Sequence, residues 1–371
     1  MQQCLELAER GRYTARPNPV VGALLVKNDE VLAQGWHEKA GQDHAEIMAL
    51  KLAGDKAKGA TLYVTLEPCS FTGKTGPCSQ ALIGAGISRL VYGVRDPNPR
   101  VNGQGLEQLS AAGITVDGPV LDHLAWELNQ GFFKSMIGGL PVVRCKLAMS
   151  LDGRTAMASG ESKWITGDDA RKDVQKWRAR SGAVLTGIET VLKDDPGLDV
   201  RSDIPCEQPL RVIVDSRLRI PATAKILQQP GRILVATAVT SEELLADKVK
   251  ALANDRVFVL SCPNAEGKVD LKKLLRFLVA EEQCHDVLLE SGPQLAGAML
   301  NDKLVDEVIT YIAPKFMGSD ARPLFTLEGM SSMDDAIQMT FVDVAMVGKD
   351  CRMRSRPAAT AKVITRTILT R

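Results

Sequence analysis

The sequence lacks the features that mark several protein classes. Its 371 residues carry a formal net charge of only +1, whereas a general nucleic-acid-binding protein is usually strongly basic. No apolar run reaches the roughly 18 residues that a membrane-spanning helix needs. The first residues are not expected to be a signal peptide, because Glu6 and Glu9 interrupt the apolar core that such a peptide requires. We therefore expect a cytoplasmic protein with no nucleic-acid or membrane partner.

Internal repeats and low-complexity segments are also absent. The composition is that of a globular protein, 45% hydrophobic and 25% charged, and the length suggests two or three domains. The Gly/Pro break IGGLP at 137–141 is the best domain boundary. We predict a first domain at 1–138, a second at 139–356, and a disordered basic tail at 357–371, which contains no acidic residue.

Both predicted domains show alternating strand and helix patterns, which are typical of α/β folds. In the first, strands are expected at 20–26, 31–36, 61–68 and 89–94, and helices at 44–54, 79–86, 105–113 and 123–136. In the second, strands are expected at 142–150, 183–187, 210–216, 232–237, 257–261, 286–291 and 307–314, with helices at 168–181, 242–253 and 270–281. We expect the second sheet to be largely parallel, because helices separate several of its strands.

Two of the eight cysteines, Cys69 and Cys78, occur close together in LEPCSFTGKTGPC. They could form a disulfide, be two unrelated buried thiols, or bind a metal. A reducing cytoplasm disfavours the disulfide. His44 and Glu46 lie upstream at the start of a predicted helix. One imidazole and two thiolates suit a catalytic zinc with an open fourth position for water, and Glu46 is placed to move protons.

This order of residues matches most of a known zinc-deaminase pattern, H-x-E followed by P-C-x-x-C. The sequence contains HAE and then PC, but eight residues rather than two separate the cysteines. Taken singly, His44 could be an ordinary residue at a helix end, Glu46 a solvated carboxylate, and the cysteines inert. Their combination, with each residue at the end of a predicted element, favours zinc.

The motifs resemble those of the bifunctional riboflavin-biosynthesis deaminase–reductase family. That family widens the deaminase motif to P-C-S-H-x-G-(R/K)-T-P-P-C, and this chain has PCSFTGKTGPC. Other matching stretches are RPNPVVGALLV, AGQDHAEIMAL, DPNPRVNGQG, KLAMSLDGRTAMASGESKWITG, RARSGAVLTGIETVLKDDPGLDVR, ESGPQLAGAML and YIAPKFMGSDARPLF. Phe71 replaces the usual His and Gly76 the usual Pro. The usual His would contact the substrate, so Phe71 calls the substrate affinity or rate of the deaminase into question more than its metal binding.

The resemblance implies an α/β protein with an N-terminal cytidine-deaminase-like three-layer α/β/α domain and a C-terminal dihydrofolate-reductase-like α/β domain. The first would deaminate 2,5-diamino-6-(5-phosphoribosylamino)pyrimidin-4-one with one zinc ion, and the second would reduce the ribosyl side chain with NADPH. Zinc would be held by His44, Cys69 and Cys78, with Glu46 as the proton shuttle. Asn18 would bind the substrate, although an Asn in this PNP turn could equally hold the turn.

The reductase residues come mainly from the resemblance, because no G-x-G-x-x-G opens a helix after a strand. The implied cofactor contacts are Ala148, Trp164, Thr190, Asp194, Ser216, Gly292, Pro293, Gln294, Leu295, Ala296, Gly297 and Ala298. The implied substrate contacts are Lys146, Ser162, Arg178, Leu198, Arg201 and Glu290. The two arginines suit a phosphate. Without the resemblance, Arg178 could be a solvated helix residue and Trp164 a core residue.

Two other functions are compatible with parts of the sequence. The chain could be a different zinc nucleobase deaminase with an unrelated appended domain, although that class predicts a P-C-x-x-C loop. It could also be a nucleotide-binding or scaffold protein whose deaminase has decayed and which retains only the reductase. Phe71 is the only feature that supports this alternative. The partner expected in the main interpretation is a phosphorylated pyrimidine. The sequence leaves the oligomeric state open, a homo-oligomer included.

Overall fold

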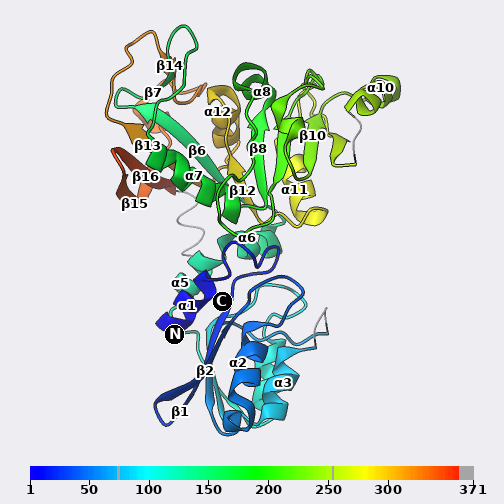
Figure 1. Ribbon diagram of the computed structural model, residues 1–371, viewed down its shortest axis with the longest axis vertical. Helices are drawn as coiled ribbons and strands as arrows, with labels where there is room; N and C mark the ends of the chain where they lie inside the picture. The colour runs from blue at the N-terminus through cyan, green and yellow to red at the C-terminus, as the bar shows by residue number, and fades with distance from the viewer. Residues whose placement is uncertain (73–75, 253–254, 359–371) are drawn as a thin grey trace. The chain divides into compact units, whose positions relative to one another are not determined.

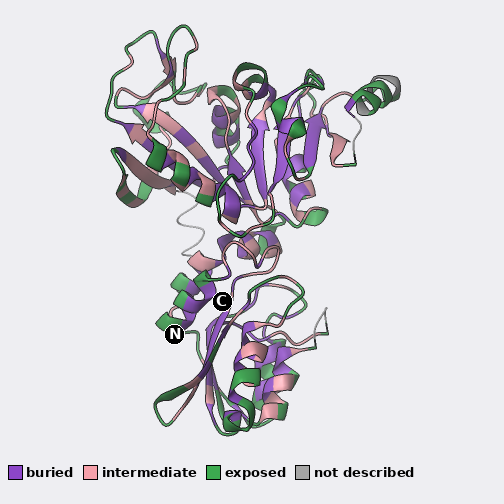
Figure 2. Ribbon diagram, viewed as in Figure 1, coloured by how far each residue is buried: buried purple, intermediate pink, exposed green. Residues whose placement is uncertain are grey.

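The structure is a computed structural model that describes residues 1–72, 76–252 and 255–358. The chain divides into two compact units, Met1–Leu140 and Pro141–Arg371 (Figure 1). Burial is concentrated along the strands of each unit (Figure 2). Among the described helices, none is both long and apolar enough to cross a membrane.

The first unit contains one five-stranded sheet, in the order β2-β1-β3-β4-β5. β1 pairs antiparallel with β2 and β3, whereas β3, β4 and β5 are parallel. The strands are β1 (Gly22–Lys27), β2 (Glu30–Trp36), β3 (Thr61–Leu66), β4 (Arg89–Val94) and β5 (Thr115–Asp117). The helices are α1 (Gln2–Glu9), α2 (Ala45–Ala53), η1 (Gly54–Ala57), α3 (Cys78–Ala85), α4 (Gln104–Ala111), α5 (Asp122–Leu128) and α6 (Gln130–Gly138).

Helices cover both faces of this sheet because successive strand residues point to opposite sides. Ala23 and Leu25 of β1 join a core cluster with residues of α2, α3 and α4. Leu24, which lies between them in sequence, packs instead with Cys4 and Leu7 of α1. The result is the expected three-layer α/β/α domain, in which α2 follows β2 and α3 follows β3 along the chain.

The second unit contains a nine-stranded sheet, in the order β11-β10-β9-β8-β12-β6-β13-β16-β15. It is parallel from β11 to β13, as expected, and antiparallel in the last two pairings. The strands are β6 (Val142–Ser150), β7 (Arg154–Ala156), β8 (Ala183–Gly187), β9 (Leu210–Val214), β10 (Ile233–Thr237), β11 (Val257–Ser261), β12 (Asp286–Leu289), β13 (Glu307–Ala313), β14 (Arg322–Pro323), β15 (Met339–Val347) and β16 (Asp350–Pro357). The helices are α7 (Asp168–Arg180), α8 (Ile188–Asp194), α9 (Lys225–Gln228), α10 (Glu242–Leu252), α11 (Leu271–Ala280), α12 (Pro293–Asn301) and η2 (Met333–Asp335).

The structure differs from the predicted elements at several places, of which three bear on the domain plan. The helix expected at 123–136 is two helices, α5 and α6, because the side chain of Asn129 bonds both the N–H and the carbonyl of Val20. The hairpin β15–β16 was not predicted, since residues of β15 alternate little in polarity. The tail predicted from residue 357 begins inside the last strand, which runs to Pro357, and residues 359–371 lie outside the described residues.

Candidate zinc centre and reductase site

Three predicted zinc ligands lie at the ends of separate elements in the first unit. His44 immediately precedes α2, and Cys78 is the first residue of α3. Cys69 lies three residues after Leu66, the last residue of β3. The backbone N–H of Cys78 donates to Cys69 Sγ at 3.3 Å. A helix N-terminus favours a nearby thiolate, so the start of α3 helps to hold Cys69 in the form that binds metal.

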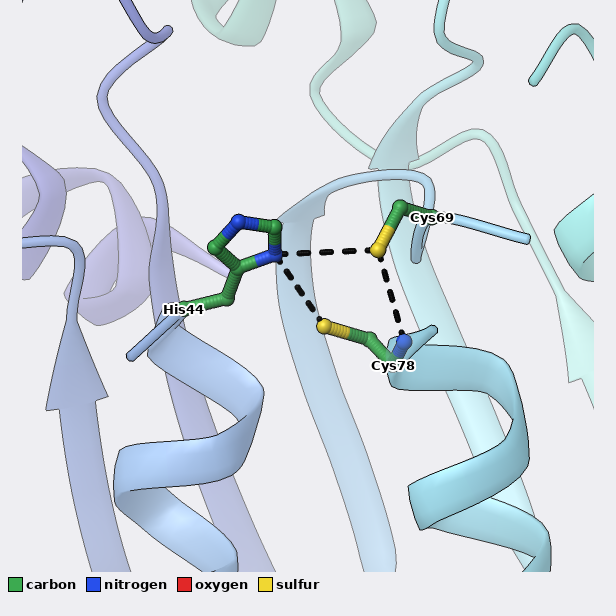
Figure 3. Close-up of side chains that lie close together, drawn as sticks. All are labelled: His44, Cys69 and Cys78. Atoms are coloured by element: carbon green, nitrogen blue, oxygen red, sulfur yellow. Dashed lines mark hydrogen bonds between the residues drawn. The ribbon is translucent and has the colours of Figure 1, made fainter. Parts of the chain in front are cut away.

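The ligand atoms converge on one point (Figure 3). His44 Nδ1 lies 3.2 Å from Cys78 Sγ and 3.7 Å from Cys69 Sγ, and the three ligand atoms are within 4.8 Å of one another. Zinc–nitrogen and zinc–sulfur bonds of about 2.0 and 2.3 Å place tetrahedral ligand atoms roughly 3.5 Å apart. The three side chains therefore fit zinc. Both cysteines are free thiols, so the disulfide interpretation is wrong.

Electrostatics at this centre favours a thiolate. A hydrogen bond from Cys78, reinforced by His44, lowers the pKa of Cys69 to about 4 although burial opposes this. The same hydrogen bond and burial raise the pKa of Cys78 well above its usual value. The pKa of His44 is raised, chiefly by its hydrogen bond with Cys69. A bound cation would favour the deprotonated form of every ligand.

Glu46 is buried beside these ligands in the first turn of α2, with 3% of its surface exposed. It is therefore not a solvated surface carboxylate. Desolvation by burial raises its pKa, while the nearby His44 acts in the opposite direction. A carboxyl group with a raised pKa can both take and return a proton near neutral pH, which is what an acid–base residue requires.

Asn18 is connected to the zinc centre by His37, a residue that sequence reasoning missed. Its Nδ2 lies 3.0 Å from Nε2 of His37, whose Nδ1 lies 3.0 Å from the carbonyl oxygen of Asp43. The His37 ring meets the His44 ring edge to face, with centroids 5.4 Å apart. Burial lowers the pKa of His37. A lone His after a strand carries no motif, so only the tertiary contact identifies it.

The loop between β4 and α4 is tied to the zinc centre by Glu67, which sequence reasoning also missed. The Glu67 carboxylate is buried and accepts backbone N–H bonds from Asp96, Gly103 and Gly105 at 2.9–3.1 Å. Burial raises the pKa of Glu67, and burial also raises that of Asp96 to about 7. Glu67, which lies two residues before the zinc ligand Cys69 in the sequence, thus fixes the position of the 96–105 loop.

Phe71, the departure from the family pattern, contacts that same loop. The guanidinium of Arg100 lies over the Phe71 ring, 4.0 Å from its centroid, and Ser70 Oγ donates to the Arg100 carbonyl at 3.4 Å. A cation over an aromatic face is attracted by the ring quadrupole. Phe71 therefore connects the cysteine loop to the 96–105 loop. At Gly76 an added Cβ would meet nothing within 4 Å among the described atoms, so no close contact requires glycine there.

In the second unit, three of the predicted substrate residues form one charged cluster that is largely shielded from solvent. Arg178 donates two hydrogen bonds to Glu290, from Nε at 2.6 Å and from Nη2 at 3.1 Å. Lys146 Nζ lies 3.9 Å from Glu290 Oε2. Burial opposes the charge on Glu290, but Arg178 outweighs it and lowers the pKa of the carboxylate. Arg178 is therefore a buried ion-pair residue and not a solvated helix residue.

This pairing distinguishes the two arginines that are predicted to bind phosphate, a role that stays a prediction. The remaining Arg178 nitrogen, Nη1, donates to the Asp199 carbonyl at 3.0 Å, so each of its three nitrogens already donates to a protein acceptor. Arg201 is the more exposed arginine, with 58% of its side chain accessible and its Nε 3.6 Å from Asp199 Oδ1. Leu198 is buried just before this segment. Arg201 is thus the arginine with donors available to a ligand.

The predicted cofactor turn is brought against Thr190. Gly292 caps α12, and its N–H donates to Thr190 Oγ1 at 3.2 Å. Helix geometry leaves the N–H groups of Gln294 and Leu295 without acceptors in their own helix, which suits a phosphate. An added Cβ at Gly297 would lie 1.9 Å from the Thr326 carbonyl oxygen, so tight packing requires this glycine. The turn therefore fits the phosphates of a dinucleotide.

The other predicted reductase residues are more dispersed. Trp164 is 65% exposed and lies under Arg171, whose guanidinium is 4.4 Å from the ring centroid, so it is not a core residue. Ser216 Oγ accepts the Val269 N–H at 3.2 Å, and the Asp194 carbonyl accepts from Lys163 at 3.3 Å. The remaining predicted reductase residues lie at these places: Ala148 in β6, Ser162 before α7, and Pro293, Ala296 and Ala298 in α12.

Comparison with known proteins matches both units. Residues 1–94 match the family model "Cytidine and deoxycytidylate deaminase zinc-binding region", and residues 141–353 match "RibD C-terminal domain". The chain is 46% identical over 362 residues to the riboflavin biosynthesis protein RibD of Escherichia coli (strain K12), covering 94% of this chain and 96% of that protein. It is 44% identical over 369 residues to the Haemophilus influenzae RibD, covering 96% of each.

Solved structures give the same result. Acinetobacter baumannii RibD, form 1, superimposes with a TM-score of 0.88 at 47% identity, covering 96% of this chain and 97% of that one. A Thermotoga maritima diaminohydroxyphosphoribosylaminopyrimidine deaminase/5-amino-6-(5-phosphoribosylamino)uracil reductase superimposes with a TM-score of 0.85 at 33% identity, with the same coverage. The likeness extends over both units, so the interpretation as a different deaminase with an unrelated appended domain is wrong.

Proposed function

Because the chain belongs to the RibD family and is a bifunctional riboflavin-biosynthesis enzyme with deaminase and reductase activities, we propose which substrates and residues it uses. The first unit hydrolyses the exocyclic amine of 2,5-diamino-6-(5-phosphoribosylamino)pyrimidin-4-one and releases ammonia. The second unit then reduces the ribosyl side chain of the deaminated product to ribityl with NADPH. The name of the Thermotoga maritima relative supports both substrates. The pathway chemistry is consistent with a cytoplasmic enzyme whose substrate is a small phosphorylated pyrimidine.

One observation carries the deaminase assignment. His44, Cys69 and Cys78 converge to within 4.8 Å, and the buried Glu46 lies beside them. When bound there, zinc supplies a Lewis acid that lowers the pKa of a coordinated water toward neutrality. Glu46 would serve as the acid–base group, accepting a proton on the water side of the site and returning it to the leaving amine, and its raised pKa suits that role. Asn18 contacts the pyrimidine. The intact ligand set also counts against a decayed deaminase.

In the reductase unit, the residues bind and orient while the hydride comes from the cofactor. The start of α12 and Thr190 hold cofactor phosphate, since Gly292 leaves the helix N–H groups accessible. Arg201 provides fixed positive charge for the substrate phosphate. Glu290, oriented by Arg178, accepts hydrogen bonds from sugar hydroxyls. We assign the deaminase to the unit that ends at Leu140 and the reductase to the unit that begins at Pro141.

The decisive experiment supplies the diaminopyrimidine substrate and NADPH together and follows ammonia and NADPH at once. Ammonia release should precede NADPH oxidation, and omitting the first substrate should abolish both. Supplying the deaminated ribosylamino-uracil alone should restore NADPH oxidation without ammonia. Failure to oxidise NADPH with that compound would contradict the reductase assignment.

The metal assignment has its own test. Purified protein should contain about one zinc per chain, because three protein ligands and one open position form a single catalytic site. Cys78→Ala should lose the zinc and ammonia release while NADPH oxidation with the deaminated substrate continues. A zinc-free preparation that still releases ammonia would refute the assignment.

A further inference from the structure

His37 is a buried histidine that none of the predicted roles uses. It follows β2, and only 2% of its surface is exposed. One ring nitrogen faces the Asp43 carbonyl and the other faces the Asn18 side chain, each at 3.0 Å. Its ring also packs against the ring of His44. The histidine therefore lies between a backbone acceptor, a zinc ligand and a proposed substrate residue.

The hydrogen bonds determine which ring nitrogen carries the proton. A backbone carbonyl can only accept, so Nδ1 of His37 must be the N–H donor to Asp43. In the neutral ring Nε2 is then an acceptor, and the Asn18 group that faces it must be the donating Nδ2. Oδ1 of Asn18 consequently points the other way, and it has no hydrogen-bond partner in the described part of the chain.

We propose that His37 is a positioning residue of the deaminase, which holds the Asn18 amide so that Oδ1 accepts a hydrogen bond from an N–H group of the pyrimidine. This inference rests on the proposed function of the first unit. The backbone carbonyl of Asp43 sets the His37 tautomer, and His37 in turn sets the orientation of Asn18. A pyrimidine that presents an N–H group to Asn18 Oδ1 binds well. A pyrimidine that presents a carbonyl oxygen to Oδ1 binds poorly, because two acceptors then face each other.

Two substitutions of His37 separate its two hydrogen bonds. In His37→Gln, the amide oxygen can occupy the place of Nε2 and still accept from Asn18. In His37→Asn, the shorter amide can replace Nδ1 and still donate to Asp43, but nothing faces Asn18. We expect His37→Asn to raise the KM for the diaminopyrimidine about tenfold, the usual effect of a lost hydrogen bond, with kcat little changed. His37→Gln should stay within about threefold of the original KM.

The experiment measures ammonia-release kinetics in the full chain for both variants, alone and combined with Asn18→Ala. Zinc content and NADPH oxidation with the deaminated substrate serve as controls for the fold of each unit. In the Asn18→Ala background, His37→Asn should cause no further rise in KM. Retained zinc, a KM effect confined to His37→Asn, and its absence in that background would together support the inference.

The opposite results would overturn it. Equal effects of the Asn and Gln variants, loss of zinc in His37→Asn, or an undiminished effect without Asn18 would each show that His37 acts structurally. If Asn18→Ala itself leaves KM unchanged, the inference falls together with the substrate role of Asn18. Ammonia release by the unsubstituted protein would still support the proposed deaminase, so the two failures are distinguishable.

Discussion

The first unit and the second unit treat buried carboxylates in opposite ways. In the first, burial raises the pKa of Glu46, Glu67 and Asp96, and none of the three forms a salt bridge in the described part of the chain. In the second, arginines overcome the effect of burial and lower the pKa of Asp286, Glu290 and Glu307. The first arrangement suits a site that moves protons, and the second suits a site that binds with fixed charges.

The reactions explain the contrast. Hydrolytic deamination requires a group that takes a proton and returns it within one turnover, so an unpaired carboxyl is useful. Hydride transfer requires a cofactor and substrate held in register, and permanent ion pairs such as Arg178–Glu290 serve that purpose. A buried pair costs free energy to desolvate, so its presence here is evidence for orientation more than for stability.

The largest expected effect comes from removing the proton carrier of the first unit. Glu46→Gln should lower the rate of ammonia release by roughly 10²–10⁴-fold, because the amide cannot accept or return a proton. Zinc content and NADPH oxidation with the deaminated substrate should be unchanged. Exposed Glu30→Gln, in the same unit, is the matched control and should leave both activities intact. Ammonia release by Glu46→Gln near the original rate would show that Glu46 is not the acid–base residue of the first unit.

The next effect tests the fixed charges of the second unit. Glu290→Gln removes the ion-pair partner of buried Arg178 and of Lys146, which should cost about 3–5 kcal/mol of unfolding free energy and most of the reductase activity. Denaturant unfolding measures the first effect and NADPH oxidation the second.

The matched control for Glu290→Gln is the exposed ion pair of Arg219 with Glu189, whose side chains are 44% and 48% accessible. Glu189→Gln should cost less than about 1 kcal/mol, because solvent screens an exposed pair. Equal losses in the two variants would mean that burial does not distinguish these pairs.

Acid should affect the two units in opposite directions. Arg144 and Arg354 overcome burial and lower the pKa of Glu307 from 4.5 to about 2, so its stabilisation is complete above pH 4.5 and is lost as the pH falls toward 2. The loss is about 3 kcal/mol. Burial raises the pKa of Asp96 from 3.8 to about 7, so its contribution is lost as the pH rises through that interval.

Hydrogen exchange measured against pH can follow β13 and β16 separately from β3 and β4. The protection factors of amides in β13 and β16, which correct for the intrinsic pH dependence of exchange, should fall as the pH falls between 4.5 and 2, and Glu307→Gln should remove most of that fall. A Glu307→Gln protein with unchanged acid sensitivity would show that another group is responsible.

The smallest effect concerns Phe71. Phe71→Leu removes the aromatic face beneath Arg100, a partly exposed interaction of about 0.5–1 kcal/mol, and should raise the deaminase KM two- to fivefold at most. Phe71→Tyr keeps the face and should behave like the original protein, while Phe71→His restores the usual family residue. The readout is ammonia-release kinetics, with reductase activity as the control. A hundredfold loss in Phe71→Leu would mean that this ring contacts the substrate directly.

Particular residues show how far the sequence could lead. The ligand set His44, Cys69 and Cys78 was predictable because each residue has metal chemistry and precedes or follows an expected element. The parallel sheet was predictable from runs of apolar strand residues separated by helices. The hairpin β15–β16 was not predictable, because strand pairing across a sheet edge leaves little pattern in a mostly exposed segment.

What the sequence by itself determined is the chemistry available to this protein: a zinc-binding set with a nearby carboxylate, a glycine-rich helix start, and two α/β units. Tertiary structure alone decided which groups are paired. It buried Glu46 beside the zinc ligands with no salt-bridge partner among the described residues, joined Arg178 to Glu290, and put His37 between Asp43 and Asn18. These outcomes depend on contacts between residues distant in the chain, and pKa values and hydrogen-bond direction follow from such contacts.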